Sequence, residues 1–147
     1  MGTNRRSQLP TTVGPTSRPV VNTRRYGPSI LVDAKGEKLL FDCGRAATVR
    51  LAEAGVGVKD IDKIFLTHLH SDHILSVPDI LLVGWTQQRM TPLRVWGPEG
   101  TRDMMDNMLK TFAFDIHIRR DLHGVIFRLR LCSGDRYRTT RHSPRHS

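Results

Sequence analysis

The sequence predicts a single domain of mixed α/β or α+β class. Short apolar runs alternate along the middle of the chain with segments whose apolar residues recur at helical spacing, as expected for a sheet with helices packed against it. The length of 147 residues and the hydrophobic content of 38% fit one modest core, and no internal repeat is visible. A cluster of histidines between residues 68 and 73, directly after one apolar run, is the candidate functional site.

The first half of this unit predicts a β-hairpin, a helix and a buried strand. Two apolar runs, 29–32 and 38–41, flank a glycine-containing turn, which is typical of a hairpin. Residues 45–55 have helical apolar spacing and end at Gly55, a suitable C-terminal cap. Residues 63–67 then predict the strand that leads into the histidines.

The second half predicts a helix, a strand and a further helix. Residues 73–89 are mostly apolar, and Pro78 fits only a break or the first turn of a helix that begins near Val77. Residues 93–96 predict a short strand. Residues 99–112 predict an amphipathic helix whose three methionines lie on one apolar face, a pattern more typical of a core than of a cofactor site.

The two ends of the chain differ in composition from the middle. Residues 1–28 hold four prolines, five arginines and no acidic residue, and predict a loop segment. We expect the domain at 29–118 and an atypical arginine-rich tail at 119–147. The net charge of +9 belongs to the ends, because residues 29–116 carry ten basic and twelve acidic side chains. Basic tails can bind nucleic-acid phosphates, but they are more commonly just solvated.

Composition also limits the compartment. No apolar segment approaches the length that crosses a bilayer, and the arginine-bearing N-terminus is not followed by the apolar block of a secretory signal. Cys43 and Cys132 are too few for a disulfide framework, which fits a reducing compartment. The sequence therefore predicts a soluble cytoplasmic protein without membrane contact.

The stretch Thr67-His68-Leu69-His70-Ser71-Asp72-His73 carries the chemistry. In an extended segment residues i and i+2 share a face, so His68 and His70 can present imidazole nitrogens to one metal ion. Asp72 and His73 lie past a turn and are expected to point elsewhere, where they could bind a second ion. Zinc suits imidazole with carboxylate, although manganese or iron has acceptable ligands here too. A structural or adventitious role for three histidines and an aspartate is the less favoured alternative.

This stretch resembles the H-x-H-x-D-H signature of the metallo-β-lactamase-fold hydrolases. The flanking sequences are similar to the branch that contains ribonuclease Z and its arylsulfatase-like and phosphodiesterase-like relatives, and they lie at Gly27–Val32, Leu40–Gly44 and Pro92–Gly100. The resemblance covers about residues 20–118 and implies the N-terminal half of a four-layer αββα sandwich with a di-zinc site at one edge of the sheets.

Carried over to this chain, the resemblance implies a role for each residue of the motif. His68 and His70 would bind the first zinc, and Asp72 and His73 the second. A hydroxide between the ions would attack a phosphodiester, for example at a tRNA 3′ end, or a sulfate or other ester. Asp72 would also be the proton acceptor in catalysis. Asp42 would orient the ligands from behind them, or would serve only as a turn residue.

The chain also departs from the family pattern. Family members continue with a third ligand histidine, a bridging aspartate and a last histidine, so this chain is expected to be a partial copy. Asp135, in Ser-Gly-Asp, is a weak metal candidate because it follows His73 too closely. One hypothesis for the tail after about Asp121 is a shifted reading frame or aberrant termination.

A half-sandwich would have an incomplete metal shell, able to retain one zinc at best, and an uncovered sheet face that favours self-association. The alternative to a hydrolase is therefore a truncated, inactive fragment that at most binds zinc or a partner.

Overall fold

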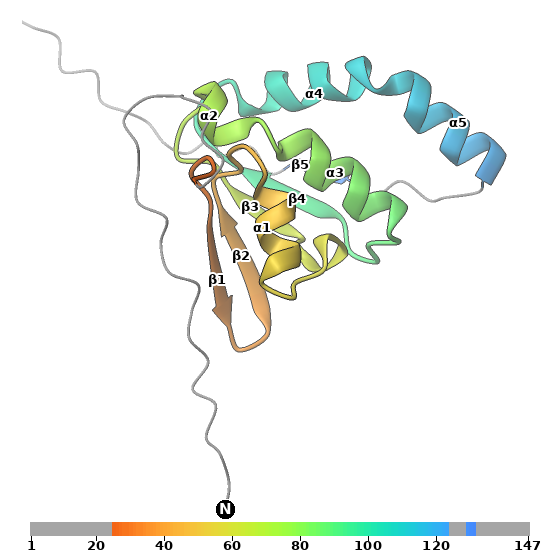
Figure 1. Ribbon diagram of the computed structural model, residues 1–147. Coiled ribbons are helices and arrows are strands. Elements are labelled where there is room, and N and C mark those ends of the chain that lie inside the picture. The colour runs from red at the N-terminus through yellow and green to blue at the C-terminus, as the bar shows by residue number, and fades with distance from the viewer. Residues whose placement is uncertain (1–24, 124–128, 132–147) are drawn as a thin grey trace, which may run out of the picture.

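The computed structural model describes residues 25–123 and 129–131, which form one five-stranded sheet with helices packed on it (Figure 1). The strands lie in chain order, with β1 antiparallel to β2 and the other pairs parallel. They are β1 (Ile30–Ala34), β2 (Glu37–Phe41), β3 (Lys63–Phe65), β4 (Leu93–Trp96) and β5 (Leu129–Leu131). The α/β class predicted from the alternating patterns is confirmed.

Among the described residues, five α-helices and one 3-10 turn accompany the strands. They are α1 (Ala47–Glu53), η1 (Val58–Asp60), α2 (Ser71–Ile74), α3 (Val77–Thr86), α4 (Thr101–Thr111) and α5 (Ala113–His123). Pro78 lies in the first turn of α3, as predicted, because its missing N–H is not needed there. In this part of the chain no helix is both long and apolar enough to cross a membrane.

The hairpin forms where the turn chemistry predicts it. Lys35 and Gly36, the two residues between β1 and β2, have φ values of 55° and 89°. Two consecutive positive φ values are those of the tight turn that matches the twist of a hairpin. The carboxylate of Asp33 accepts a hydrogen bond from the Gly36 N–H at 3.0 Å, which holds the turn.

The core lies on one face of the sheet. The strands contribute Leu40, Ile64 and Val95, a row of register partners that are each 0–1% exposed. Side chains of α1, α3 and α4 pack on this row, and Figure 1 shows α1 and α3 in front of the sheet. The buried Met105, with Met104 and Met108 packed beside it, confirms that the methionine stripe is core.

The other face of the sheet carries a second apolar row, which we call the open-face row: Ile30, Phe41, Phe65 and Trp96. These residues are direct register partners across β1 to β4, so they point to the same side. The Phe41 and Phe65 ring centroids are 5.1 Å apart, and those of Phe65 and Trp96 are 4.7 Å apart. Ile30 is 49% exposed.

The structure differs from the sequence expectations at two places. The strand predicted at 63–67 ends at Phe65, so the histidines lie in a loop and not in an extended strand. A helix not predicted from the sequence, α5, crosses residue 118, where we placed the end of the domain. Phe112 ends α4, and no glycine or proline there prevents the chain from starting a new helix. Ile116 is buried and so anchors that new helix in the core. The three-segment division remains a prediction.

Candidate metal centre

The candidate site lies at the carboxyl ends of two neighbouring parallel strands. Asp42 directly follows β2, and the histidine loop follows β3. Backbone hydrogen bonds extend the sheet past the strand ends, from the Asp42 N–H to the Phe65 carbonyl at 2.9 Å and from the Leu66 N–H to the Trp96 carbonyl at 2.7 Å. Polar residues at such strand ends meet at one edge of the sheet, where α/β proteins commonly place their sites.

Asp42 is the centre of the hydrogen-bond network in this region. It is 7% exposed and has a φ of 57°, a conformation that few residues other than glycine, asparagine and aspartate adopt readily. Its carboxylate accepts hydrogen bonds from the backbone N–H and the hydroxyl of Thr67, at 2.8 Å each, and from Nδ1 of His73, also at 2.8 Å. Asp42 therefore touches a motif histidine directly and is more than a turn residue.

The three motif histidines lie together. The ring centroid of His68 is 4.6 Å from that of His70 and 3.9 Å from that of His73. Our expectation that His73 would point away from the first two histidines is wrong. The chain turns into α2 directly after His70, and the hydrogen bond from the His73 N–H to the His70 carbonyl, at 3.0 Å, brings His73 back beside His68.

Close backbone packing holds the loop that carries Asp72 and His73. The Cys43 N–H donates to the His73 carbonyl at 2.7 Å, and the Ser76 N–H donates to the Cys43 carbonyl at 2.9 Å. A Cβ placed on Gly44 would lie 2.5 Å from the Asp72 carbonyl oxygen, so only glycine fits there. The segment after β2 and the histidine loop are thus tied to each other.

Cys43 lies beside this network but offers no reactive thiolate. The side chain is completely buried. Burial raises the pKa of its thiol well above the ordinary range, and the charge of Asp42 raises it further. Cys43 therefore packs as a small apolar residue.

The donor set fits a divalent metal in chemistry and in part in geometry. Because Asp42 takes up Nδ1 of His73, the other ring nitrogen, Nε2, is left facing Asp72, whose Oδ2 lies 3.8 Å away. Zinc bonds to nitrogen and oxygen are about 2.0–2.2 Å long, so two donors at this separation can reach one ion. Within residues 25–123 and 129–131, no three His, Cys, Asp or Glu side chains are close enough to hold an ion together.

Sequence reasoning missed one polar residue of this site, Thr67. Its hydroxyl donates to Asp42 and lies 3.0 Å from Nδ1 of His68. Nothing in the spacing of the motif marks it, because a threonine at a strand end is common for its β propensity alone. Asp135, the weak metal candidate, lies outside the described residues.

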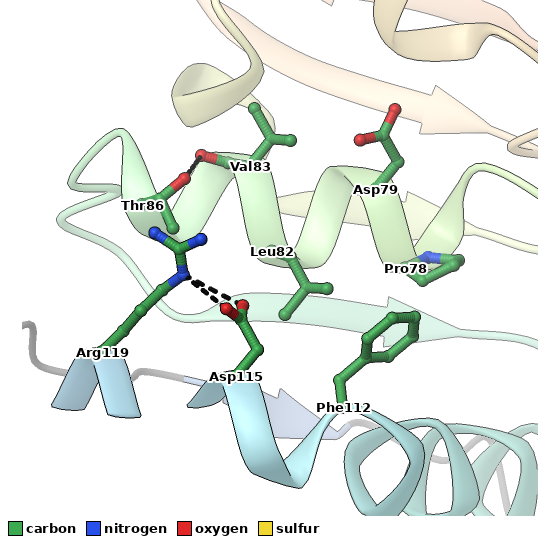
Figure 2. A pocket seen from close by; sticks show the side chains of 8 residues that line it. All are labelled: Pro78, Asp79, Leu82, Val83, Thr86, Phe112, Asp115 and Arg119. Atoms are coloured by element: carbon green, nitrogen blue, oxygen red, sulfur yellow. Dashed lines mark hydrogen bonds and ion pairs between the residues drawn. The ribbon is translucent and has the colours of Figure 1, made fainter. Parts of the chain in front are cut away.

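A separate hollow of about 410 Å³ lies between α3 and the start of α5 (Figure 2). The side chain of Leu82 on α3 points toward Phe112, and the ion pair between Arg119 and Asp115 lies at one end. None of the residues that line it belongs to the histidine motif. Of its three ionic groups, Asp115 and Arg119 are paired with each other, and Asp79 accepts a hydrogen bond from the hydroxyl of Thr48. The hollow therefore adds no group to the candidate metal centre.

Comparison with known proteins places these features in a family. The family model described as the metallo-beta-lactamase superfamily matches residues 22–125. A ribonuclease Z of Mycolicibacterium gilvum is 46% identical over 107 residues, which are 71% of this chain and 37% of that protein. A ribonuclease Z of Mycobacterium marinum is 44% identical over 112 residues, 74% of this chain and 40% of that protein. The chain thus spans about two fifths of the length of these curated relatives.

Solved structures agree on the fold. The crystal structure of the short form of human tRNase Z matches with a TM-score of 0.57 at 26% identity. The match covers 83% of this chain and 40% of the tRNase Z chain. A diphosphatase of the PhnP family has a TM-score of 0.53 at 22% identity, covering 74% of this chain and 38% of its own, which is a likeness of fold. The described residues therefore have the fold of part of these larger proteins.

Proposed function

Because this chain belongs to the metallo-beta-lactamase superfamily, we propose that it is a metal-dependent hydrolase of the ribonuclease Z type. The ligands are His68, His70, Asp72 and His73, and zinc is the metal that suits them best, ahead of manganese or iron. The observation that carries the proposal is the hydrogen bond from Nδ1 of His73 to Asp42 at 2.8 Å. Histidine ligands in metalloproteins commonly donate their second ring nitrogen to a carboxylate in this way.

The residues of this chain have distinct tasks in such a reaction. A bound divalent metal would supply Lewis-acid chemistry: it would activate water and stabilise the charge that develops on the phosphate oxygens as phosphorus is attacked. Asp42 fixes the ring of His73 from behind. Asp72 lies 3.8 Å from Nε2 of His73, with its side chain 31% exposed, so it can reach both the metal and the solvent. It is our candidate to accept the proton of the attacking water.

The substrate that we propose is a phosphodiester, with the 3′ end of a tRNA precursor as the specific case. The ribonuclease Z relatives at 46% and 44% identity support this choice over sulfate or other esters. The arginines at the two ends would add affinity for a nucleic acid that falls with salt. A cytoplasmic location agrees with such a substrate and remains a prediction.

Hydrolysis of bis(p-nitrophenyl) phosphate tests the activity. The full chain, freed of metal and then loaded with zinc or with manganese, should release p-nitrophenol, and His70→Ala and Asp72→Asn should each lower the rate at least about 100-fold. His117→Ala, which removes an exposed histidine on α5, is the matched control and should leave the rate unchanged. Equal rates in His70→Ala and His117→Ala would refute the proposed site.

The second candidate is an inactive fragment that binds zinc or a partner. One observation favours it: the described residues bring no three donors together. Its partner would be a second copy of this chain, associated through the open-face row. Zinc that is retained without any turnover, in the same assay, would select this candidate over the hydrolase.

A further inference from the structure

Thr67 lies between Asp42 and a second histidine of the motif. Its hydroxyl oxygen is 2.8 Å from Oδ2 and 3.0 Å from Oδ1 of Asp42. The same oxygen is 3.0 Å from Nδ1 of His68. Although Thr67 is an exposed residue, its hydroxyl is thus turned toward the nearly buried carboxylate.

The direction of each hydrogen bond follows from counting protons. An ionised carboxylate only accepts, so the single hydroxyl proton of Thr67 goes to Asp42. The hydroxyl oxygen can then only accept from His68, and Nδ1 of His68 must carry a proton. By the same reasoning, Nδ1 of His73 carries a proton, since it faces Asp42 directly.

We infer that Thr67 is a positioning residue. Its hydroxyl donates to Asp42 and therefore accepts from His68, which fixes the ring proton of His68 on Nδ1. One carboxylate then sets the same tautomer in two histidines, directly in His73 and through the hydroxyl in His68. In both neutral rings Nε2 keeps its lone pair. The tautomers themselves depend only on these contacts, whereas their use in metal binding rests on the proposed function.

We call the hydrogen bonds from Asp42 through Thr67 to His68 the relay. It has a consequence for the two metal positions that the family resemblance implies. The family resemblance implies that His68 would bind one ion and His73 the other, while both rings depend on Asp42. A change at Thr67 should therefore act on His68 alone, whereas a change at Asp42 should act on both histidines. Backbone contact alone would not produce this difference, since the Thr67 N–H donates to Asp42 with any side chain at position 67.

Nitrogen NMR of the zinc-free full chain tests the relay. The ring ¹⁵N shifts are measured at a pH where the imidazoles are neutral, for the wild type, Thr67→Val, Thr67→Ser and Asp42→Asn. The wild type should show His68 and His73 protonated on Nδ1. Thr67→Val keeps the side-chain shape but removes the hydroxyl. In this variant only His68 should lose its single tautomer and shift toward the tautomer mixture of free imidazole, while His73 stays unchanged. Thr67→Ser should restore the wild-type spectrum, and Asp42→Asn should change both rings.

The control variant is Thr48→Val, which removes a different threonine hydroxyl bound to a carboxylate, that of Asp79. It should leave both rings unchanged. A wild-type His68 protonated on Nε2, or a His68 signal that is unchanged in a folded Thr67→Val variant, would overturn the inference. Should Thr67→Val not fold, a Thr67→Ser spectrum with His68 released would overturn it as well.

Zinc affinity, measured by competition with a chromophoric chelator, separates this inference from the proposed function. Thr67→Val should bind zinc about 10–100-fold more weakly, as for other residues that orient metal ligands, and Thr67→Ser should bind normally. If the tautomers behave as described and no variant binds zinc, the relay is supported and the proposed metal site fails.

Discussion

Asp42 is the residue on which the organisation of the site depends most. Its backbone adopts a φ of 57°, and its carboxylate connects the end of β2 to Thr67 and His73. A residue at this position must tolerate a left-handed backbone and must also present an acceptor on both oxygens. Asparagine meets the first requirement and fails the second, which makes Asp42→Asn an informative substitution.

We expect Asp42→Asn to fold and to bind zinc about 10–100-fold more weakly than the wild type. The Thr67 N–H donates to Oδ1 of Asp42, and Nδ1 of His73 faces Oδ2. Asparagine replaces one of these oxygens by an NH₂ donor, so it cannot accept at both positions at once. Chelator competition at neutral pH measures the affinity. Asp103→Asn, which makes the same change at an exposed position of α4, is the control, and a similar loss in both variants would contradict the role of Asp42.

Asp62, just before β3, should make the free energy of unfolding depend on pH in the acidic range. Burial raises the pKa of its carboxyl, but hydrogen bonds and charges from Lys63 and Arg94 outweigh this and hold the pKa below its ordinary value of 3.8. A pKa that is lower in the folded state stabilises the fold above about pH 4, and this stabilisation is lost as the pH falls through the folded value.

Asp62→Asn should therefore unfold more easily than the wild type in urea at pH 7. The difference between the two proteins should shrink at pH values below 3.8, where the wild-type carboxyl also becomes protonated. A difference in the free energy of unfolding that stays constant from pH 7 to pH 3 would show that Asp62 is not held ionised by its neighbours.

At the scale of elements, the contact between the segment after β2 and the histidine loop should be sensitive to a single methyl group. In Gly44→Ala the new Cβ would lie 2.5 Å from the Asp72 carbonyl oxygen, so one backbone segment must move. We expect a loss of about 2–3 kcal/mol in urea unfolding, together with weaker zinc binding. Gly55→Ala is the control: Gly55 has a φ of 71° and open space around its Cα, so only backbone strain of about 1–2 kcal/mol is expected there. Normal zinc binding by Gly44→Ala would contradict the coupling.

The elements with strong local signals could be predicted from the sequence. The turn at Lys35 and Gly36, the proline at the start of α3 and the methionine stripe of α4 each have a local physical cause, and each is confirmed. The helix α5 was missed because no glycine or proline separates it from α4 and because its charged residues resemble those of the tail. The motif residues were found from their types, but their mutual positions were not, because they depend on the turn at His70 and on β2, which is distant in sequence.

At the scale of the molecule, the open-face row is the feature that bears on association. Val32 lies on the same face, since it is two residues from Ile30 in β1, and it is 37% exposed. We expect Val32→Lys to reduce concentration-dependent association in sedimentation velocity. Val49→Lys, the same change at a valine of α1 that is 47% exposed, should have no effect. An equal effect of both variants, or of neither, would contradict self-association through the sheet.

The claim that the histidine loop is a metal centre is tested most directly by the zinc content of the purified chain. Elemental analysis should compare the wild type, His70→Ala and His117→Ala after dialysis against the same zinc buffer. The account predicts bound zinc, up to one ion per chain, in the wild type and in His117→Ala, and clearly less in His70→Ala. The same zinc content in all three proteins, or no zinc in the wild type, would contradict it.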